Sequence, residues 1–164
     1  MFGFGKHTPS EDPQRAAAIE QSKKVIRDLI HAMADASPEE SERLAQQVKD
    51  RCGGDTLLPF DFKQKAFKKA RELQCNANMR AADRLMHQAA RLAAEENMKD
   101  RGAKVAEARR YFAKACTLGA DEEWRKAFQR LNETILLTGG VQHKGPTRAK
   151  PLDTAPKPPN RAKM

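Results

Sequence analysis

The chain of 164 residues has few aromatic residues, few β-branched residues and no long apolar run. Aromatic side chains make up only 5% of it, whereas Ala, Leu, Glu, Lys, Arg and Gln, which favour helices, dominate. No proline occurs between Pro59 and Pro146. This scarcity of strand formers and helix breakers predicts an all-α protein, an antiparallel bundle of five to six helices.

The cysteines are too few and too scattered for a disulfide framework. Cys52, Cys75 and Cys116 are odd in number and far apart, and they do not fit a zinc knuckle either. A reducing compartment is the simplest interpretation. The apolar runs are shorter than the roughly 18 residues of a membrane span, and the N-terminus lacks the apolar core of a signal peptide. We therefore expect a cytoplasmic protein without a transmembrane span.

Signatures of catalysis are also missing. The chain has no Glu-x-x-His pair for a di-iron bundle, no Gly-x-Ser-x-Gly and no Gly-rich phosphate loop. Asp83 and His87 lie four residues apart and could bind a metal weakly, but a solvated pair on a helix is the favoured interpretation. We predict no enzyme, no cofactor and no metal site. An enzyme with a His or Cys site assembled from distant helices is the third possibility.

Glycines and capping residues divide the first part of the chain into helices. The first helix is expected to start after Ser10, with Asp12 in its first turn, and to end near Asp35. The second starts at a Ser37 cap, with Glu40 reaching back, and stops at the glycine pair 53–54.

The remaining helices are expected from the same signals. Asp61 can cap the third helix, which either continues through the weak helix formers CNAN at 75–78 or breaks there. Later helices should end before Gly102 and Gly119, where glycine takes the left-handed conformation without strain. A last helix is predicted over residues 121–138.

The net charge of +9 is concentrated at the C-terminal end. The last 24 residues carry six Lys or Arg side chains and one Asp, so five of the nine net positive charges lie there. With many prolines and almost no large apolar residues, residues 139–164 are predicted to be a disordered tail. Residues 1–9 are predicted to be a flexible N-terminus and residues 10–138 a single helical domain.

One stretch is similar to the second helix of a tetratricopeptide repeat, a module that binds other proteins. The residues with the matching spacing are Ala108, Phe112, Ala115 and Leu118. The same spacing recurs 26 residues earlier, starting at Ala82, whereas a full repeat is about 34 residues long. The ordinary period of an amphipathic helix therefore explains the pattern, and repeat-like helix pairs are the alternative architecture.

Aromatic residues could serve as anchors for a protein partner. Tyr111 and Trp124 flank the turn before the last helix, although a core role for Trp124 is the favoured interpretation. Phe2 and Phe4 could dock in a groove or on a membrane surface. The alternative for these two is a frayed terminus.

Basic residues could serve as contacts for phosphates or other anions. In the third helix four of them lie near Phe60, Phe62 and Phe67, a pattern that can track nucleic acid: Lys65, Lys68, Lys69 and Arg71. The alternative is a plain solvated face. The tail adds six more, namely Lys144, Arg148, Lys150, Lys157, Arg161 and Lys163. They suit nucleic acid, an anionic membrane surface or an acidic partner, and the alternative is a solubilising tail.

Binding is thus the expected function. We expect a non-catalytic adaptor or accessory protein that binds another protein through a helical groove, formed by the Ala-rich helices after residue 79. The alternative is a nucleic-acid-binding protein that uses the third helix and the tail on phosphates. Because more than half of the net charge lies in the tail rather than on a folded face, the sequence favours the adaptor.

Overall fold

The computed structural model describes residues 12–138, which form five α-helices and no strand. The helices are α1 (Pro13–Ala32), α2 (Pro38–Gly54), α3 (Phe60–Ala94), α4 (Met98–Leu118) and α5 (Glu122–Thr138). The predicted all-α bundle is confirmed. The expectations for the N-terminus and for the tail, including Phe2, Phe4 and the six tail cations, lie outside the described residues.

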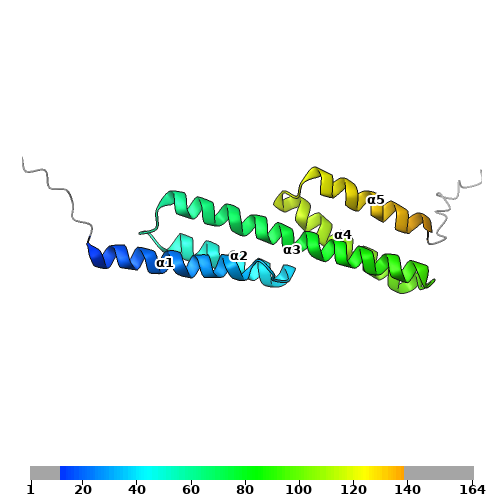
Figure 1. Ribbon diagram of the computed structural model, residues 1–164, viewed down its shortest axis with the longest axis horizontal. Coiled ribbons are helices and arrows are strands. Elements are labelled where there is room, and N and C mark those ends of the chain that lie inside the picture. The colour runs from blue at the N-terminus through cyan, green and yellow to red at the C-terminus, as the bar shows by residue number, and fades with distance from the viewer. Residues whose placement is uncertain (1–11, 139–164) are drawn as a thin grey trace, which may run out of the picture.

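The long helix α3 is the spine of the molecule. Its 35 residues span about 52 Å at 1.5 Å per residue. Helices α1 and α2 lie along its first half, and α4 and α5 lie along its second half, so that the described part of the chain is elongated (Figure 1). The helices have 20, 17, 35, 21 and 17 residues, which is not the even pattern of a stacked repeat.

Helix α3 runs without a break through the CNAN segment at 75–78. Cys75, Ala77 and Asn78 are buried there, and the Asn78 amide donates to the Gln74 carbonyl at 2.8 Å. Because these residues pack against other helices, tertiary contacts outweigh the weak helix propensity. The first alternative, one continuous helix, is therefore the observed one.

The helix starts agree only in part with the sequence prediction. The Ser37 cap is confirmed, since its Oγ accepts from the Glu40 backbone N–H at 3.2 Å. The Glu40 carboxylate does not reach back; it accepts from Arg43 Nε at 2.9 Å. Asp12 caps α1 and does not lie in its first turn. Asp61 lies inside the first turn of α3, without a capping bond, so its predicted role was wrong.

The two glycines expected to end helices behave differently. Gly119 follows α4 with φ 100°, in the left-handed region, and the Ala120 N–H then reaches the Ala115 carbonyl at 3.0 Å, which confirms the prediction. Gly102 lies inside α4, so the predicted stop there was wrong. The preceding helix already ends at Ala94, and Glu96 takes the left-handed conformation, with φ 59°.

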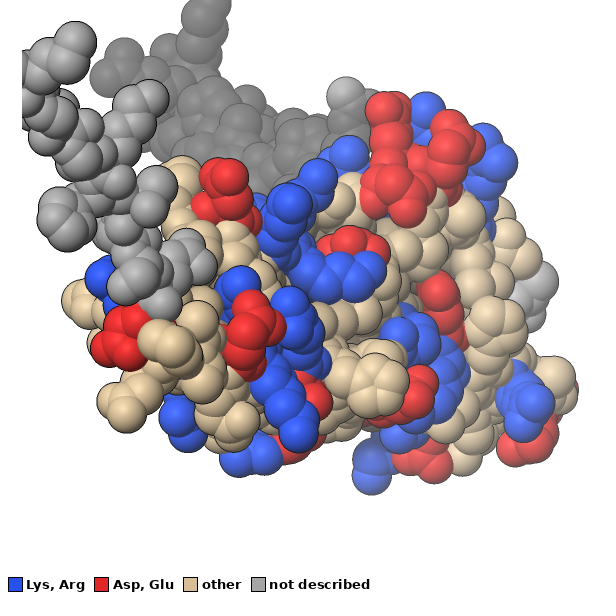
Figure 2. All heavy atoms as spheres, turned by 60° about the vertical axis from the view of Figure 1, so that its left-hand side comes forward, with Lys and Arg blue, Asp and Glu red and all other residues tan. Residues whose placement is uncertain are grey.

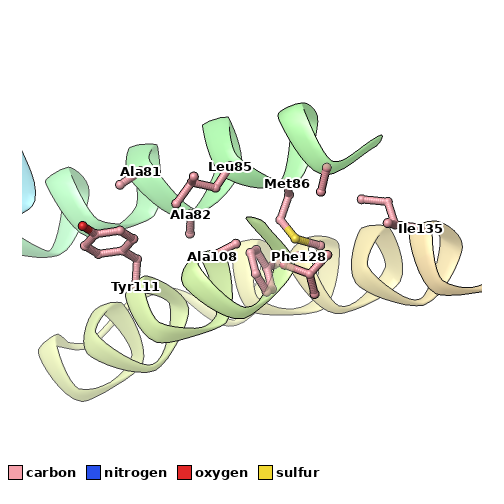
Figure 3. Packing of buried hydrophobic residues seen from close by; sticks show 10 residues of the cluster. Ala81, Ala82, Leu85, Met86, Ala108, Tyr111, Phe128 and Ile135 are labelled. Atoms are coloured by element: carbon pink, nitrogen blue, oxygen red, sulfur yellow. The ribbon is translucent and has the colours of Figure 1, made fainter. Parts of the chain in front are cut away.

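Each half of the molecule has its own apolar core. The core of the first half consists of Ile26, Met33, Leu44, Ala45, Val48, Cys52, Leu58, Ala66 and Ala70. The core of the second half consists of Ala81, Ala82, Leu85, Met86, Ala89, Val105, Ala108, Tyr111, Phe128 and Ile135. Figure 3 shows Ala82 of α3 opposite Ala108 of α4, and Met86 directed toward Phe128 of α5. Small residues between α3 and α4 let these helices approach closely.

Polar contacts join the two halves near the middle of α3. The Tyr111 hydroxyl donates to Glu39 Oε1 at 2.6 Å, and Lys114 Nζ lies 3.2 Å from Glu42 Oε2. A small cluster of Cys75, Ala115 and Ala120 fills the space beneath. Helix α4 is therefore attached both to α3 and to the beginning of α2.

Candidate partner-binding groove

Several cations of the described chain stabilise the ends of helices. The carbonyl end of a helix carries partial negative charge, which a cation from a neighbouring helix offsets. Four cations donate to carbonyls at or just after such ends: Lys63 to Asp55 at 2.6 Å, Arg71 to Thr117 and Leu118 at 3.1 Å each, Arg80 to Ala34 at 2.9 Å, and Arg101 to Ile135 at 3.4 Å. Three cations of α3, Lys63, Arg71 and Arg80, thus have a role within the fold.

Three of the four predicted anion-binding residues of α3 lie on one exposed face, and the fourth, Arg71, contacts α4. Arg71 holds the end of α4, and Lys69 pairs with Glu72 at 3.0 Å. Lys65 and Lys68 are exposed. Positions 65, 68 and 69 are three and four residues apart and share one face of a helix with 3.6 residues per turn, whereas position 71 is turned toward α4. The contact of these cations with phosphates stays a prediction.

The two predicted aromatic anchors both make contacts within the chain. Tyr111 is only 8% exposed. Its hydroxyl lowers the pKa of Glu39 by hydrogen bonding to the carboxylate, and the same bond raises the pKa of Tyr111. Trp124 is half-buried, and its Nε1 donates to both carboxylate oxygens of Asp83 at 3.1 Å. The ring of Trp124 packs against Phe112, with centroids 5.4 Å apart. Both side chains serve the packing of α4 and α5.

Asp83 and His87 make separate contacts within the fold. Nδ1 of His87 lies 2.7 Å from the Asp83 backbone carbonyl, while the Asp83 carboxylate accepts from Trp124. Within residues 12–138, no three His, Cys, Asp or Glu side chains are grouped as a metal would need. Burial raises the pKa of the Cys52 and Cys75 thiols, which lowers their reactivity at neutral pH.

Side chains of α4 contact successive turns of α2 up to the end of α4. Tyr111 meets Glu39, and Lys114 meets Glu42, each one helical turn further along. Leu118, the last residue of α4, lines the same hollow as Ala45 and Lys49. Helix α4 therefore lies over α3 beside the first half of α2. Among residues 12–138, no helix continues α4 along the next turns of α2.

A groove of about 230 Å³ opens where α4 ends, and we call it the α2–α3 groove. It is lined by Ala45, Lys49, Phe67, Ala70, Arg71, Gln74 and Leu118. On α3, Phe67 and Gln74 are seven residues apart and share one helix face. Stepping back by three and seven residues from Phe67 extends this face to Gln64 and Phe60, both exposed. The Phe60 side chain is 72% exposed, which is unusual for its size.

The charge of this groove is of one sign. Lys49 and Arg71 are its charged residues, and none of the described residues that line it is acidic. Figure 2, in which the end of the molecule where α3 begins comes forward, shows Lys and Arg gathered across the surface with Asp and Glu among them. The groove therefore differs from the surface around it, since its lining is basic and apolar whereas that surface carries charges of both signs.

A larger cavity of about 500 Å³ lies between α1 and α2, with charges of both signs. Asp50, Arg51 and Asp55 line it, together with Leu57. A hydrogen bond from Ser22 lowers the pKa of Asp55, whose carboxylate also accepts from the Leu57 backbone N–H at 2.8 Å. Because charges of both signs line it, this cavity specifies no ligand chemistry.

Sequence reasoning named Phe60, Phe67, Arg71 and Leu118 for other reasons, and it did not identify the groove that they border. Phe60, Gln64, Phe67, Arg71 and Gln74 recur at steps of three or four, so the α3 side was readable as one stripe. The α2 side depends on where α4 ends, which no local pattern reveals. The groove also lies in the other half of the molecule from the expected one, because the Ala-rich faces after residue 79 are buried against each other.

Comparison with known protein families, with curated proteins and with solved structures finds no match to this chain. Within residues 12–138, every helix is too short or too polar to cross a membrane.

Proposed function

We propose that the chain is a non-catalytic adaptor that binds another protein through the α2–α3 groove. One observation carries the proposal. Helix α4 packs along α3 beside α2 as far as Leu118, and beyond Leu118 the groove lined by Ala45, Lys49 and Phe67 is filled by none of the residues 12–138. A second helix can lie in this groove between α2 and α3, in line with the end of α4.

Exposed aromatic residues supply the apolar anchors that such a surface needs. Phe60 lies on the groove face of α3 with most of its side chain in solvent, and Phe67 is half-buried in the groove. Aromatic residues in partly enclosed positions tend to dominate binding energy at protein interfaces. Burying Phe60 against a partner removes apolar surface from water, which is favourable.

A nucleic-acid ligand is the second candidate, and one arrangement favours it. Lys23 Nζ and the Arg27 guanidinium lie 5.9 Å and 5.7 Å from the ring centre of Phe62. Cations beside an aromatic ring suit single-stranded nucleic acid. However, Glu20 lies 2.7 Å from Lys23 and 3.8 Å from Arg27, which offsets part of this positive charge. The groove is therefore the stronger candidate.

Site-specific cross-linking tests the proposal. A photoreactive residue is placed at exposed Gln64 in the groove face, and in a matched control at exposed Gln129 of α5. In extract of the source cells, we expect a discrete protein cross-link from position 64 only, and we expect Phe60→Asp to abolish it. Equal cross-linking from both positions, or cross-linking to nucleic acid, would contradict the proposal.

A further inference from the structure

We infer that the α2–α3 groove binds an acidic amphipathic α-helix of another protein, laid in line with α4. The inference rests on the proposed function and names the partner's chemistry. Two features of the groove support it, its shape along α2 and the sign of its charge.

The shape of the groove fits a helix. Helix α4 already packs along α3 up to the groove, with Cys75 of α3 beside Ala115 at 3.5 Å and Arg71 beside Leu118 at 3.1 Å. From Arg71 back to Phe60 the same face of α3 runs for about 16 Å, the length of three helical turns. On α2, Gly53 lies four residues after Lys49 and is exposed.

The charge along α2 changes sign where α4 stops. Beside α4, the exposed residues of α2 are acidic. Glu39 accepts a hydrogen bond from Tyr111 of α4, and Glu42 pairs with Lys114 of α4. One and two turns further, α2 presents Ala45 and then Lys49. A helix in the groove, in line with α4, therefore meets a cation on α2 and the Arg71 guanidinium on α3. Carboxylates on the flanks of the incoming helix complement both.

The apolar contacts require the partner to be amphipathic. Phe67 and Leu118 line the groove, and exposed Phe60 lies seven residues before Phe67 on the same face of α3. A helix that presents apolar residues at steps of three and four can cover all three side chains with one face. Its acidic residues then lie beside that face, within reach of Lys49 and Arg71.

Selection from a random peptide library tests the inference on the full chain. Phage that display random 16-residue peptides are selected on the wild-type chain, and the enriched peptides are synthesised with a fluorescent label. Binding is measured by anisotropy to the wild-type chain, to Lys49→Glu, to Phe60→Ala and to Lys99→Glu. Lys49, Phe60 and Lys99 are all exposed, and circular dichroism confirms that each variant is folded.

The expected result is enrichment of acidic peptides with helical apolar spacing. Their affinity should fall at least about fivefold with Lys49→Glu and with Phe60→Ala, and should not change with Lys99→Glu. Replacing the responsible peptide Glu by Lys should restore binding to Lys49→Glu. Groove-dependent peptides that are neutral or basic would overturn the inference and leave the proposed function standing. If no enriched peptide depends on Phe60 or Lys49, both fail.

Discussion

The two halves of the molecule use α3 in opposite ways. In the second half, α3 presents Cys75, Ala82 and Ala89 at steps of seven, all buried, and α4 covers them. The same row continued into the first half reads Lys68 and Asp61, which are exposed. This row of α3 is small and apolar only in the second half, so α4 can pack on it only there. Where α4 ends, the neighbouring α2–α3 groove is open.

The largest expected effect concerns whether the two halves of the molecule unfold in one transition or in two. Met33 and Met86 are each fully buried, one in each core. Replacing either by Ala should lower the free energy of unfolding by about 2–5 kcal/mol, since a cavity is left in a packed core. Because α3 belongs to both cores, we expect one urea transition, displaced to a similar extent by both variants.

Two separate transitions, each affected by only one variant, would contradict this expectation. Circular dichroism would follow helix content, and Trp124 fluorescence would follow the second half alone, because the only tryptophan lies there. Coincidence of the two probes is the test of a single cooperative unit.

The end of α4 depends on a contact made by the first half of α3. Arg71→Met removes two hydrogen bonds to the carbonyls of Thr117 and Leu118 and should cost about 1–2 kcal/mol, less than a buried pair because Arg71 is exposed. The matched control is Lys68→Met, one turn earlier and equally exposed. We expect hydrogen exchange to increase in the last turn of α4 for Arg71→Met only; a similar increase in both variants would refute the capping role.

The bond between Tyr111 and Glu39 measures how strongly the halves are coupled. A double-mutant cycle of Tyr111→Phe and Glu39→Ala should give a coupling free energy of about 0.5–1.5 kcal/mol, typical of one hydrogen bond. Denaturant unfolding of the four proteins provides the value. A coupling indistinguishable from zero would mean that the bond does not join the halves in solution.

The same bond predicts a dependence on pH. The folded-state pKa of Glu39 is lowered from 4.5, so the stability it contributes is full above that pH and is lost as the pH falls through the lower folded value. The folded-state pKa of Tyr111 is raised from 10, so its contribution is full below pH 10 and is lost as the pH rises through the higher folded value. The stability difference between wild type and Tyr111→Phe should therefore be constant between these limits and shrink outside them.

Two glycines give the smallest and most specific effects. Gly102 lies inside α4 with open space around an added Cβ, so Gly102→Ala should stabilise the chain by about 0.5–1 kcal/mol. Gly119 also has open space, but its φ of 100° disfavours any side chain, so Gly119→Ala should destabilise by about 1 kcal/mol. Thermal unfolding measures both, and effects of equal sign would contradict the assignment of the end of α4.

Local signals predicted much of the fold but little of the groove. The Ser37 cap and the Gly119 stop depend on a few adjacent residues, and both are confirmed. The end of α3 was missed because Glu96, not a glycine, takes the left-handed conformation. Whether the helix continues through 75–78 could not be decided locally, since the segment is stabilised by burial, with Cys75 packed against Ala115 and Ala120. The groove combines residues from three helices, so it exists only once those helices are packed.

Hydroxyl-radical footprinting of phenylalanine in the full chain tests the central contrast most directly. Phe60 and Phe128 have the same side chain, but one is 72% exposed at the open groove and the other 4% exposed in the filled half. We predict rapid oxidation of Phe60 and strong protection of Phe128. Equal protection of the two would contradict the account, because it would mean that the surface of α3 in the first half is covered as completely as in the second.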